Sequence, residues 1–237
     1  MTPDARFAVV SIPTARTDLP RRTLPVRAVV VHTTGTGIVE QALRKGRPPL
    51  DFAAAHYAKA SSFASHYLIG YEGEVVGTVP EAVVAYHAGV PTAHRGLYAL
   101  GRAVWPRYVG GTDRGGPQTH YGDWLARWPD LLSPLDLVTG KVVNGSTVGV
   151  DLLAPVPGVA FHPEEQVAMA ARLVADILRR HSLVASRPTV LRHADVDPFS
   201  RSTKRGGWDP PREAFTRLCR LLGFAAWPEE PVAEAVA

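Results

Sequence analysis

Two histidines in this chain lie where an imidazole could bind a metal ion. His32 ends the apolar run Val26–His32 and is followed by the small residues Thr33–Gly37, while His193 opens the polar segment His193–Pro198. A buried strand that ends in an imidazole places it at the rim of a sheet, where α/β folds present reactive groups. Two imidazoles and a carboxylate would form a three-ligand zinc site whose fourth position is open for water.

More than one aspartate could supply the carboxylate of such a site. Asp209 precedes Pro210, and this pair also suits a helix start, with the aspartate as N-cap and the proline in the first turn. On the residues alone, capping is the more common role. Asp195 and Asp197 are fallback ligands, although an aspartate so close to a histidine more often orients it than binds the metal. A strand-end histidine such as His32 is itself more often a packing residue than a ligand, so the residues alone do not decide the site.

The composition is that of a globular protein with a mildly basic surface. The chain has 237 residues, 46% of them hydrophobic, which suits one large domain or two small ones. The net charge is +4, but the basic residues are scattered, and the densest groups are the pairs Arg21–Arg22 and Arg179–Arg180. Because no polybasic stripe is present, we expect no nucleic-acid partner. Weak long-range attraction to an anionic polymer is still favoured.

The sequence shows no sign of disulfides, of export or of a membrane span. Cys219 is the only cysteine, so no intramolecular disulfide can form, and its position in a predicted helix indicates an inert buried thiol. The first residues lack the basic and long apolar regions of a signal peptide. No stretch approaches the roughly 20 apolar residues that a membrane span needs. We expect a soluble monomer.

Strands and helices alternate along the chain, which predicts an α/β fold with a mixed central β-sheet flanked by helices. Short apolar and β-branched runs predict the strands, and apolar spacing of three and four predicts the helices. The predicted strands are Val26–His32, Ser65–Gly70, Glu74–Val79, Val83–Tyr86, Thr147–Leu153 and Val190–Arg192. The predicted helices are Ile38–Arg44, Leu50–Ala60, Glu164–His181 and Arg212–Leu222. The second and third strands are joined by a tight turn at Tyr71–Gly73, so they should form a hairpin.

We expect a single domain over residues 25–224, between an N-terminal arm (1–24) and a flexible tail (225–237). Within it, residues 90–144 are irregular and dense in glycine, proline and aromatic residues. A long segment of this kind is usually a binding loop or lid, and here it would form a wall over a groove. The alternative is a surface excursion with an apolar cluster of its own.

Taken in order, five segments resemble those of one protein family. They are Val29–Gly35, Ala64–Glu81, Ala85–Gly89, Asn144 with Thr147–Asp151, and Arg192–Pro198 with Asp209–Pro210. The family is the zinc-dependent N-acetylmuramoyl-L-alanine amidases, which share a fold with phage lysozyme-type amidases and peptidoglycan recognition proteins. The resemblance covers roughly residues 26–215, with one long insertion.

The resemblance implies an enzyme that splits the amide between N-acetylmuramic acid and L-alanine in peptidoglycan or muropeptides. It implies that His32, His193 and Asp209 bind Zn²⁺. It also places Asp151 at the position of the family's catalytic glutamate, where a carboxylate takes a proton from water and returns it to the leaving amine. The expected substrate-binding residues are His66, His87 and Asn144. His66 and His87 could instead be core residues, and of the two His87 is the one that we expect in the groove.

The chain departs from the family pattern at four points. Asp151 is one methylene shorter than the usual glutamate. The interval from His193 to Asp209, 16 residues, is longer than usual, although a doubling of loop length costs only about 0.6 kcal/mol. Gly207 stands where a basic residue is common, so we expect Lys204, or else Arg205, to assist the oxyanion. Finally, Tyr86 replaces a tryptophan.

Two other functions compete with this interpretation. The first is a non-catalytic peptidoglycan-binding module of the same fold, which the shortened Asp151 and the missing basic residue favour and the full ligand set opposes. The second is another hydrolase, such as a zinc peptidase that cuts within the stem peptide, but neither His-Glu-x-x-His nor Gly-x-Ser-x-Gly is present. The lack of a signal peptide favours a cytoplasmic enzyme that acts on soluble muropeptides, or a lytic enzyme that reaches intact sacculi by another route.

Overall fold

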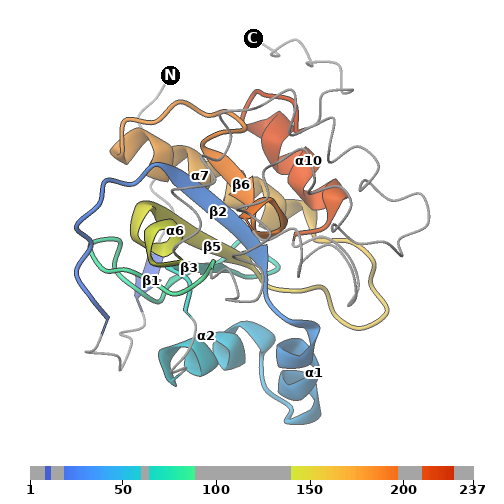
Figure 1. Ribbon diagram of the computed structural model, residues 1–237. Coiled ribbons are helices and arrows are strands. Elements are labelled where there is room, and N and C mark those ends of the chain that lie inside the picture. Colours follow the sequence, from blue (N-terminus) through green and yellow to red (C-terminus); the bar gives the residue numbers. More distant parts are fainter. Residues whose placement is uncertain (1–8, 12–18, 60–63, 89–139, 197–209, 227–237) are drawn as a thin grey trace, which may run out of the picture.

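The computed structural model describes residues 9–11, 19–59, 64–88, 140–196 and 210–226 (Figure 1). These residues form a six-stranded sheet in the order β1-β4-β3-β5-β2-β6. The strands are β1 (Val9–Ser11), β2 (Ala28–Thr33), β3 (Tyr67–Ile69), β4 (Val75–Gly77), β5 (Thr147–Leu152) and β6 (Val190–Arg192). The helices are α1 (Thr36–Arg44), α2 (Pro49–Lys59), α6 (Gly140–Ser146), α7 (Glu164–Arg180), α8 (His193–Val196) and α10 (Arg212–Leu221).

The sheet is mixed, which confirms the predicted fold class. β2 runs parallel to both of its neighbours, β5 and β6, and β5 runs parallel to β3. β3 and β4 form the predicted antiparallel hairpin. Gly73 lies in its turn at φ +82°, a conformation that glycine adopts without steric cost. None of the helices in the described ranges is long and apolar enough to cross a membrane.

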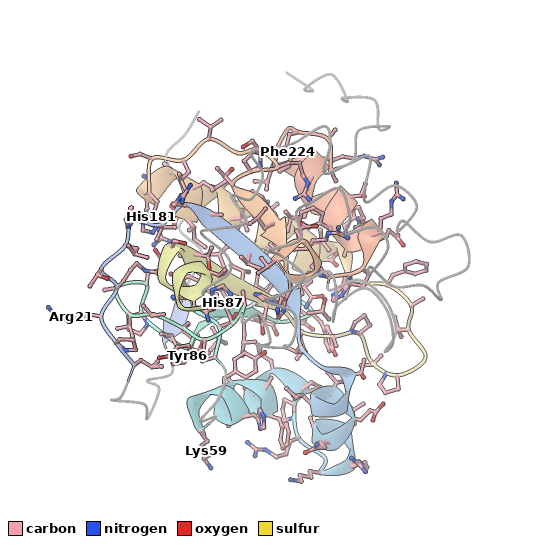
Figure 2. All side chains as sticks on the ribbon, in the orientation of Figure 1. Arg21, Lys59, Tyr86, His87, His181 and Phe224 are labelled. Carbon is pink, nitrogen blue, oxygen red and sulfur yellow. The ribbon has the colours of Figure 1, made fainter. Side chains whose placement is uncertain are left out.

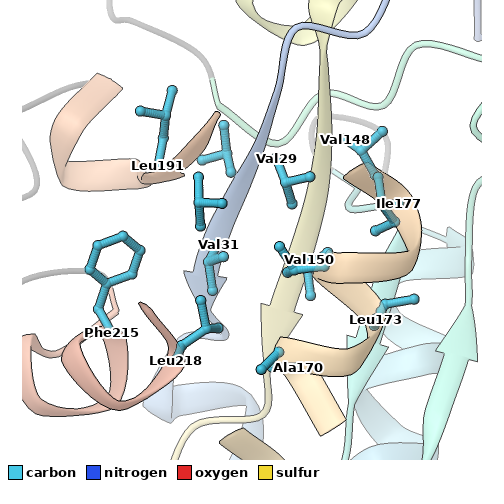
Figure 3. Close-up of a cluster of buried hydrophobic side chains, with 14 of the residues drawn as sticks. Val29, Val31, Val148, Val150, Ala170, Leu173, Ile177, Leu191, Phe215 and Leu218 are labelled. Atoms are coloured by element: carbon cyan, nitrogen blue, oxygen red, sulfur yellow. The ribbon is translucent and has the colours of Figure 1, made fainter. Parts of the chain in front are cut away.

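The main core lies where α7 and α10 pack on the sheet (Figure 3). The consecutive valines Val29–Val31 of β2 are fully buried, as expected of a central strand covered on both sides. α7 buries an amphipathic stripe that includes Ala170, Leu173 and Ile177. Because Val29 and Val31 face these helices in Figure 3, the alternation of a strand directs His32 to the opposite face.

A second cluster covers that opposite face, where α1 and α2 pack. The buried side of α2 consists of Ala53, Ala54 and Tyr57, and it lies against Leu68 of β3. The two alanines allow α2 to approach closely, and the longer Tyr57 reaches over the sheet. Its hydroxyl reaches Asp151 near the carboxyl end of β5, where the candidate site lies.

The structure differs from the sequence-based predictions at four places. Val83–Tyr86 is not a strand, because its only ladder contact is an isolated bridge between Val83 and Arg21. Residues 140–144, assigned to the irregular insertion, begin helix α6, which is held by the buried side chain of Val143. The predicted N-terminal arm contributes the edge strand β1, and the polar segment that starts at His193 begins with the short helix α8. The rest of the insertion, residues 89–139, lies outside the described ranges.

Candidate active site

The carboxyl ends of the central parallel strands bring three predicted site residues to one edge of the sheet. His32 of β2 is in register with Asp151 of β5. On the other side of β2, Val31 pairs with Arg192, and His193 follows directly. The side chains of His32, Asp151 and His193 are buried. This edge is where parallel sheets commonly carry their functional groups.

The two predicted zinc ligands face each other through the same ring atom. Nδ1 of His32 lies 3.0 Å from Nδ1 of His193, and the ring planes are 76° apart. A tetrahedral zinc site with Zn–N bonds of 2.0–2.1 Å places two nitrogens roughly 3.3 Å apart. The pair therefore fits two corners of a zinc site with little adjustment.

The third predicted ligand, Asp209, lies outside the described residues, as do Lys204, Arg205 and Asp197. In the described part of the chain, no group of three or more metal-binding side chains is present. The capping alternative for Asp209 is wrong, however, because α10 begins at Arg212 and its N-cap is Pro211. Asp209 therefore does not occupy the cap position that competed with metal binding.

His87 lies beside the sheet, near the centre of the view in Figure 2, and its ring contacts that of His32. Its Nδ1 is 3.0 Å from Nε2 of His32, and its Nε2 is 3.1 Å from Oγ1 of Thr147. Burial and the neighbouring imidazoles of His66 and His193 hold the pKa of His87 well below its ordinary value. His87 is thus a neutral imidazole in contact with a predicted ligand.

The position of His87 depends on a glycine in β5. A Cβ atom at Gly149 would lie 2.5 Å from Cγ of His87 and 2.7 Å from Oγ of Ser65. Real Cβ atoms do not approach other atoms so closely, so a side chain at this position would displace the imidazole. Gly149 therefore provides the space in which His87 packs against the strand.

We expect the substitution Gly149→Ala to impair the site by moving His87 away from His32. Zinc affinity should fall about tenfold or more, as for loss of a group that orients a ligand. Gly37→Ala is the matched control, because nothing lies within 4 Å of a Cβ atom added there. Titration of both variants with zinc against a competing chelator measures the effect, and equal affinities would contradict this account of Gly149.

Asp151 is held by two hydroxyl groups that the sequence did not suggest. Ser65 donates a hydrogen bond of 2.7 Å to its Oδ1, and Tyr57 of α2 donates one to its Oδ2. All three side chains are buried. The inward stripe of α2 was the available signal for Tyr57, because it is the one polar-tipped residue on that face. Both oxygens of the predicted general base are therefore oriented by the protein.

The other two predicted substrate-binding residues, His66 and Asn144, support the site from behind. His66 is fully buried; its Nδ1 accepts a hydrogen bond from the backbone of Gly149, and its Nε2 faces Val83 O and Arg22. Asn144 accepts hydrogen bonds through Oδ1 from two successive backbone N–H groups, those of His87 and Ala88. These contacts hold the loop that carries His87.

The burial of His66 predicts a dependence of stability on pH. Burial, and then the charge of Arg22, lower the pKa of His66 from 6.5 to about 3. The unfolded chain binds a proton at His66 more readily than the folded chain does. The contribution of neutral His66 to the free energy of unfolding is therefore complete above pH 6.5 and is lost as the pH falls toward 3. The free energy of unfolding should fall over that interval, and His66→Asn should reduce the slope by up to about 1.4 kcal/mol per pH unit.

Urea unfolding at a series of pH values, without added metal, measures this slope. The matched control is His56→Asn, since His56 is an exposed histidine on α2. Equal slopes for the wild type and His66→Asn would show that His66 does not resist protonation in the folded chain.

Asp195, a fallback ligand in the sequence analysis, is engaged elsewhere. It is fully buried, and its carboxylate accepts hydrogen bonds from the guanidinium groups of Arg187 and Arg192, at 2.8 and 2.7 Å. Burial alone would raise its pKa, but the two arginines hold the pKa below its ordinary value. The carboxylate thus ties down the start of α8, where His193 lies, and is not directed at a metal.

One further buried histidine lies beside the strand end. Nε2 of His162 lies 3.4 Å from Oγ1 of Thr33, the residue after His32. It also lines a small, partly open hollow with Pro211, where the chain enters α10. The described residues that follow Asp209 therefore begin close to the end of β2.

Known proteins were compared with the chain by sequence and by structure. The family profile described as N-acetylmuramoyl-L-alanine amidase matches residues 22–210. No curated protein sequence matches the chain. Among solved structures, hydrolase AmiA of Staphylococcus aureus in complex with its ligand is 12% identical, with a TM-score of 0.51 over 91% of this chain and 81% of that one. This likeness shows a common fold.

Two structures of AmpD are also similar to the chain. A selenomethionine derivative is 18% identical over 90% of this chain and 93% of that one, with a TM-score of 0.49. The solution structure of Citrobacter freundii AmpD is 18% identical over 90% and 89%, with a TM-score of 0.44. The family profile, which spans most of the chain, decides the assignment: this protein belongs to the N-acetylmuramoyl-L-alanine amidase family.

Proposed function

We propose that this chain is a zinc-dependent hydrolase that cleaves the amide between N-acetylmuramic acid and L-alanine in peptidoglycan or muropeptides. The observation that carries the proposal is the pair of Nδ1 atoms, 3.0 Å apart, of His32 and His193. Membership of the amidase family indicates which bond the enzyme would cut. When bound, zinc lowers the pKa of a coordinated water to about 7 and polarises the scissile carbonyl.

The proposed metal ligands are His32, His193 and Asp209. The two histidines come from strand ends in a buried sheet, so their separation is set by the register of β2 and β6. Asp209 is favoured as the third ligand because it is not the cap of α10, and because Pro211 lies beside His162 close to the end of β2. A carboxylate with two imidazoles matches the donor set of hydrolytic zinc sites.

Asp151 is the proposed general base. It is the register partner of His32, so its carboxylate lies on the same side of the sheet as the proposed metal ligands. The hydroxyls of Tyr57 and Ser65 hold its two oxygens in place, which restricts where the carboxylate can lie. Asp151 would take a proton from the attacking water and return it to the amine of L-alanine.

Lys204 is proposed to stabilise the oxyanion, with Arg205 as the other candidate. A cation near the developing charge contributes most where water is excluded. The insertion before α6 is proposed to form a wall over the substrate, because its aromatic residues offer large apolar faces at little entropic cost.

The function is tested with the full-length chain, zinc, soluble muropeptides and purified sacculi. Mass spectrometry should detect products that have lost the bond between muramic acid and L-alanine, and end-group analysis should detect the freed L-alanine amines. Binding of sacculi without new amines would instead identify a non-catalytic module. Cuts within the stem peptide would identify a peptidase.

A further inference from the structure

A series of hydrogen bonds connects the backbone of α6 to His32. The hydroxyl of Thr147 lies 2.6 Å from the carbonyl oxygen of Val143. The same hydroxyl oxygen lies 3.1 Å from Nε2 of His87, and Nδ1 of His87 lies 3.0 Å from Nε2 of His32. The series ends at Nδ1 of His32, which faces His193 at 3.0 Å.

The first group in the series determines the direction of every bond after it. A carbonyl can only accept, so the hydroxyl hydrogen of Thr147 points to Val143. The hydroxyl oxygen then presents a lone pair to Nε2 of His87, and this nitrogen carries the hydrogen. A neutral imidazole has one ring hydrogen, so Nδ1 of His87 accepts. Nε2 of His32 must therefore donate.

This direction leaves Nδ1 of His32 as the unprotonated nitrogen of its ring. A metal-binding imidazole must offer a lone pair, and the partner of its other nitrogen selects the tautomer. We propose that Thr147 and His87 are positioning residues that hold His32 in its Nε2–H tautomer and so present its Nδ1 to zinc. The identity of the metal rests on the proposed function, whereas the tautomer does not.

The surroundings of His87 fit a positioning role better than a role in substrate contact. Both of its ring nitrogens face protein groups, Thr147 on one side and His32 on the other. Asn144 holds the backbone on either side of the ring, and the absence of a side chain at Gly149 lets the ring lie against β5. These contacts fix the position of the imidazole as well as the direction of its hydrogen bonds.

The first test compares Thr147→Val with Thr147→Ser in the full-length chain. Valine keeps the shape of threonine but has no hydroxyl, whereas serine keeps the hydroxyl and loses the methyl group. We expect zinc affinity, measured by competition with a chelator, to fall about tenfold in Thr147→Val and to stay within about threefold of wild type in Thr147→Ser. A packing role would give the opposite order, and that order would overturn the proposal.

A second mutation tests whether Thr147 acts through His87. In a His87→Ala background, Thr147→Val should no longer change zinc affinity, because the series of bonds is already interrupted. Full additivity of the two losses would overturn the proposal, since Thr147 would then affect zinc by another route.

The tautomer itself is read from long-range ¹H–¹⁵N correlation spectra of the imidazoles. We expect His32 and His87 of the metal-free wild type to be in the Nε2–H form, and Thr147→Val, but not Thr147→Ser, to shift both toward a mixture. An Nδ1–H form of His32 in the wild type would overturn the proposal. A wild-type chain that binds no zinc would refute the proposed function instead, and these spectra would still decide the tautomer.

Discussion

Replacing His193 by alanine is expected to abolish both zinc binding and amide cleavage. Nδ1 of His193 lies 3.0 Å from Nδ1 of His32 at this edge of the sheet, so its loss removes a corner of the proposed metal site. Without the metal, several kcal/mol of transition-state stabilisation are lost, and turnover should fall by at least about 10³-fold. His32→Ala should have the same effect, since it removes the other nitrogen.

Metal content and turnover have to be measured on the same preparations. The matched control is His56→Ala, which removes an exposed imidazole from α2 and should leave metal content and turnover at the wild-type level. If His32→Ala or His193→Ala still carried stoichiometric zinc, the ligand assignment would be wrong. Full zinc loss with normal turnover would refute the zinc mechanism itself.

Replacing Asp151 by asparagine is expected to leave zinc in place and to reduce amide cleavage on the order of 10²–10⁴-fold, as removal of a general base does. Asparagine has nearly the shape of aspartate, and its one carbonyl oxygen can still accept from Ser65 or Tyr57. The fold should therefore be retained, while the group that takes the proton is lost.

The buried contacts of Asp151 also permit a purely structural role, and the same variant separates the two. A structural anchor would give a lower free energy of unfolding with turnover near normal, and that result would refute the general-base assignment. Asp176→Asn is the matched control, because its carboxylate lies on the surface of α7 and bonds only to Arg179 and Arg180 in the described contacts. Asp151→Glu, which restores the length usual in the family, should keep measurable turnover.

Local signals in the sequence were sufficient for most of the elements. The amphipathic period of Glu164–His181 predicted α7 to within one residue, and the apolar run that ends at His32 predicted the central strand. The turn at Tyr71–Gly73 predicted the hairpin. These features depend on interactions among residues a few positions apart, so composition and spacing reveal them. The order of weak motifs likewise predicted the family, which the family profile confirmed.

Where local signals in the sequence were weak, tertiary packing decided whether a segment formed a strand or a helix. The short strand β1 and the helix α6 have no strong pattern of their own, and each forms because the rest of the fold offers a partner: β4 for β1, and a buried place for Val143. Conversely, Val83–Tyr86 has strand-like residues but only an isolated bridge to Arg21. Tertiary contacts override propensity in segments of this length.

In the candidate site, too, some features could be predicted from the sequence and others depend on the tertiary structure. The residue types predicted that His32 and His193 could be metal ligands, but these residues are 161 positions apart, and only the parallel register of β2 and β6 sets their nitrogens 3.0 Å apart. The hydroxyl of Tyr57 on Asp151 and the contact of His87 with Thr147 arise in the same way, across 94 and 60 positions. Hydrogen bonds act over about 3 Å and in fixed directions, and sequence spacing carries no information at that precision. The sequence by itself therefore determined which groups are available for chemistry, and the tertiary structure decided which atoms of those groups meet.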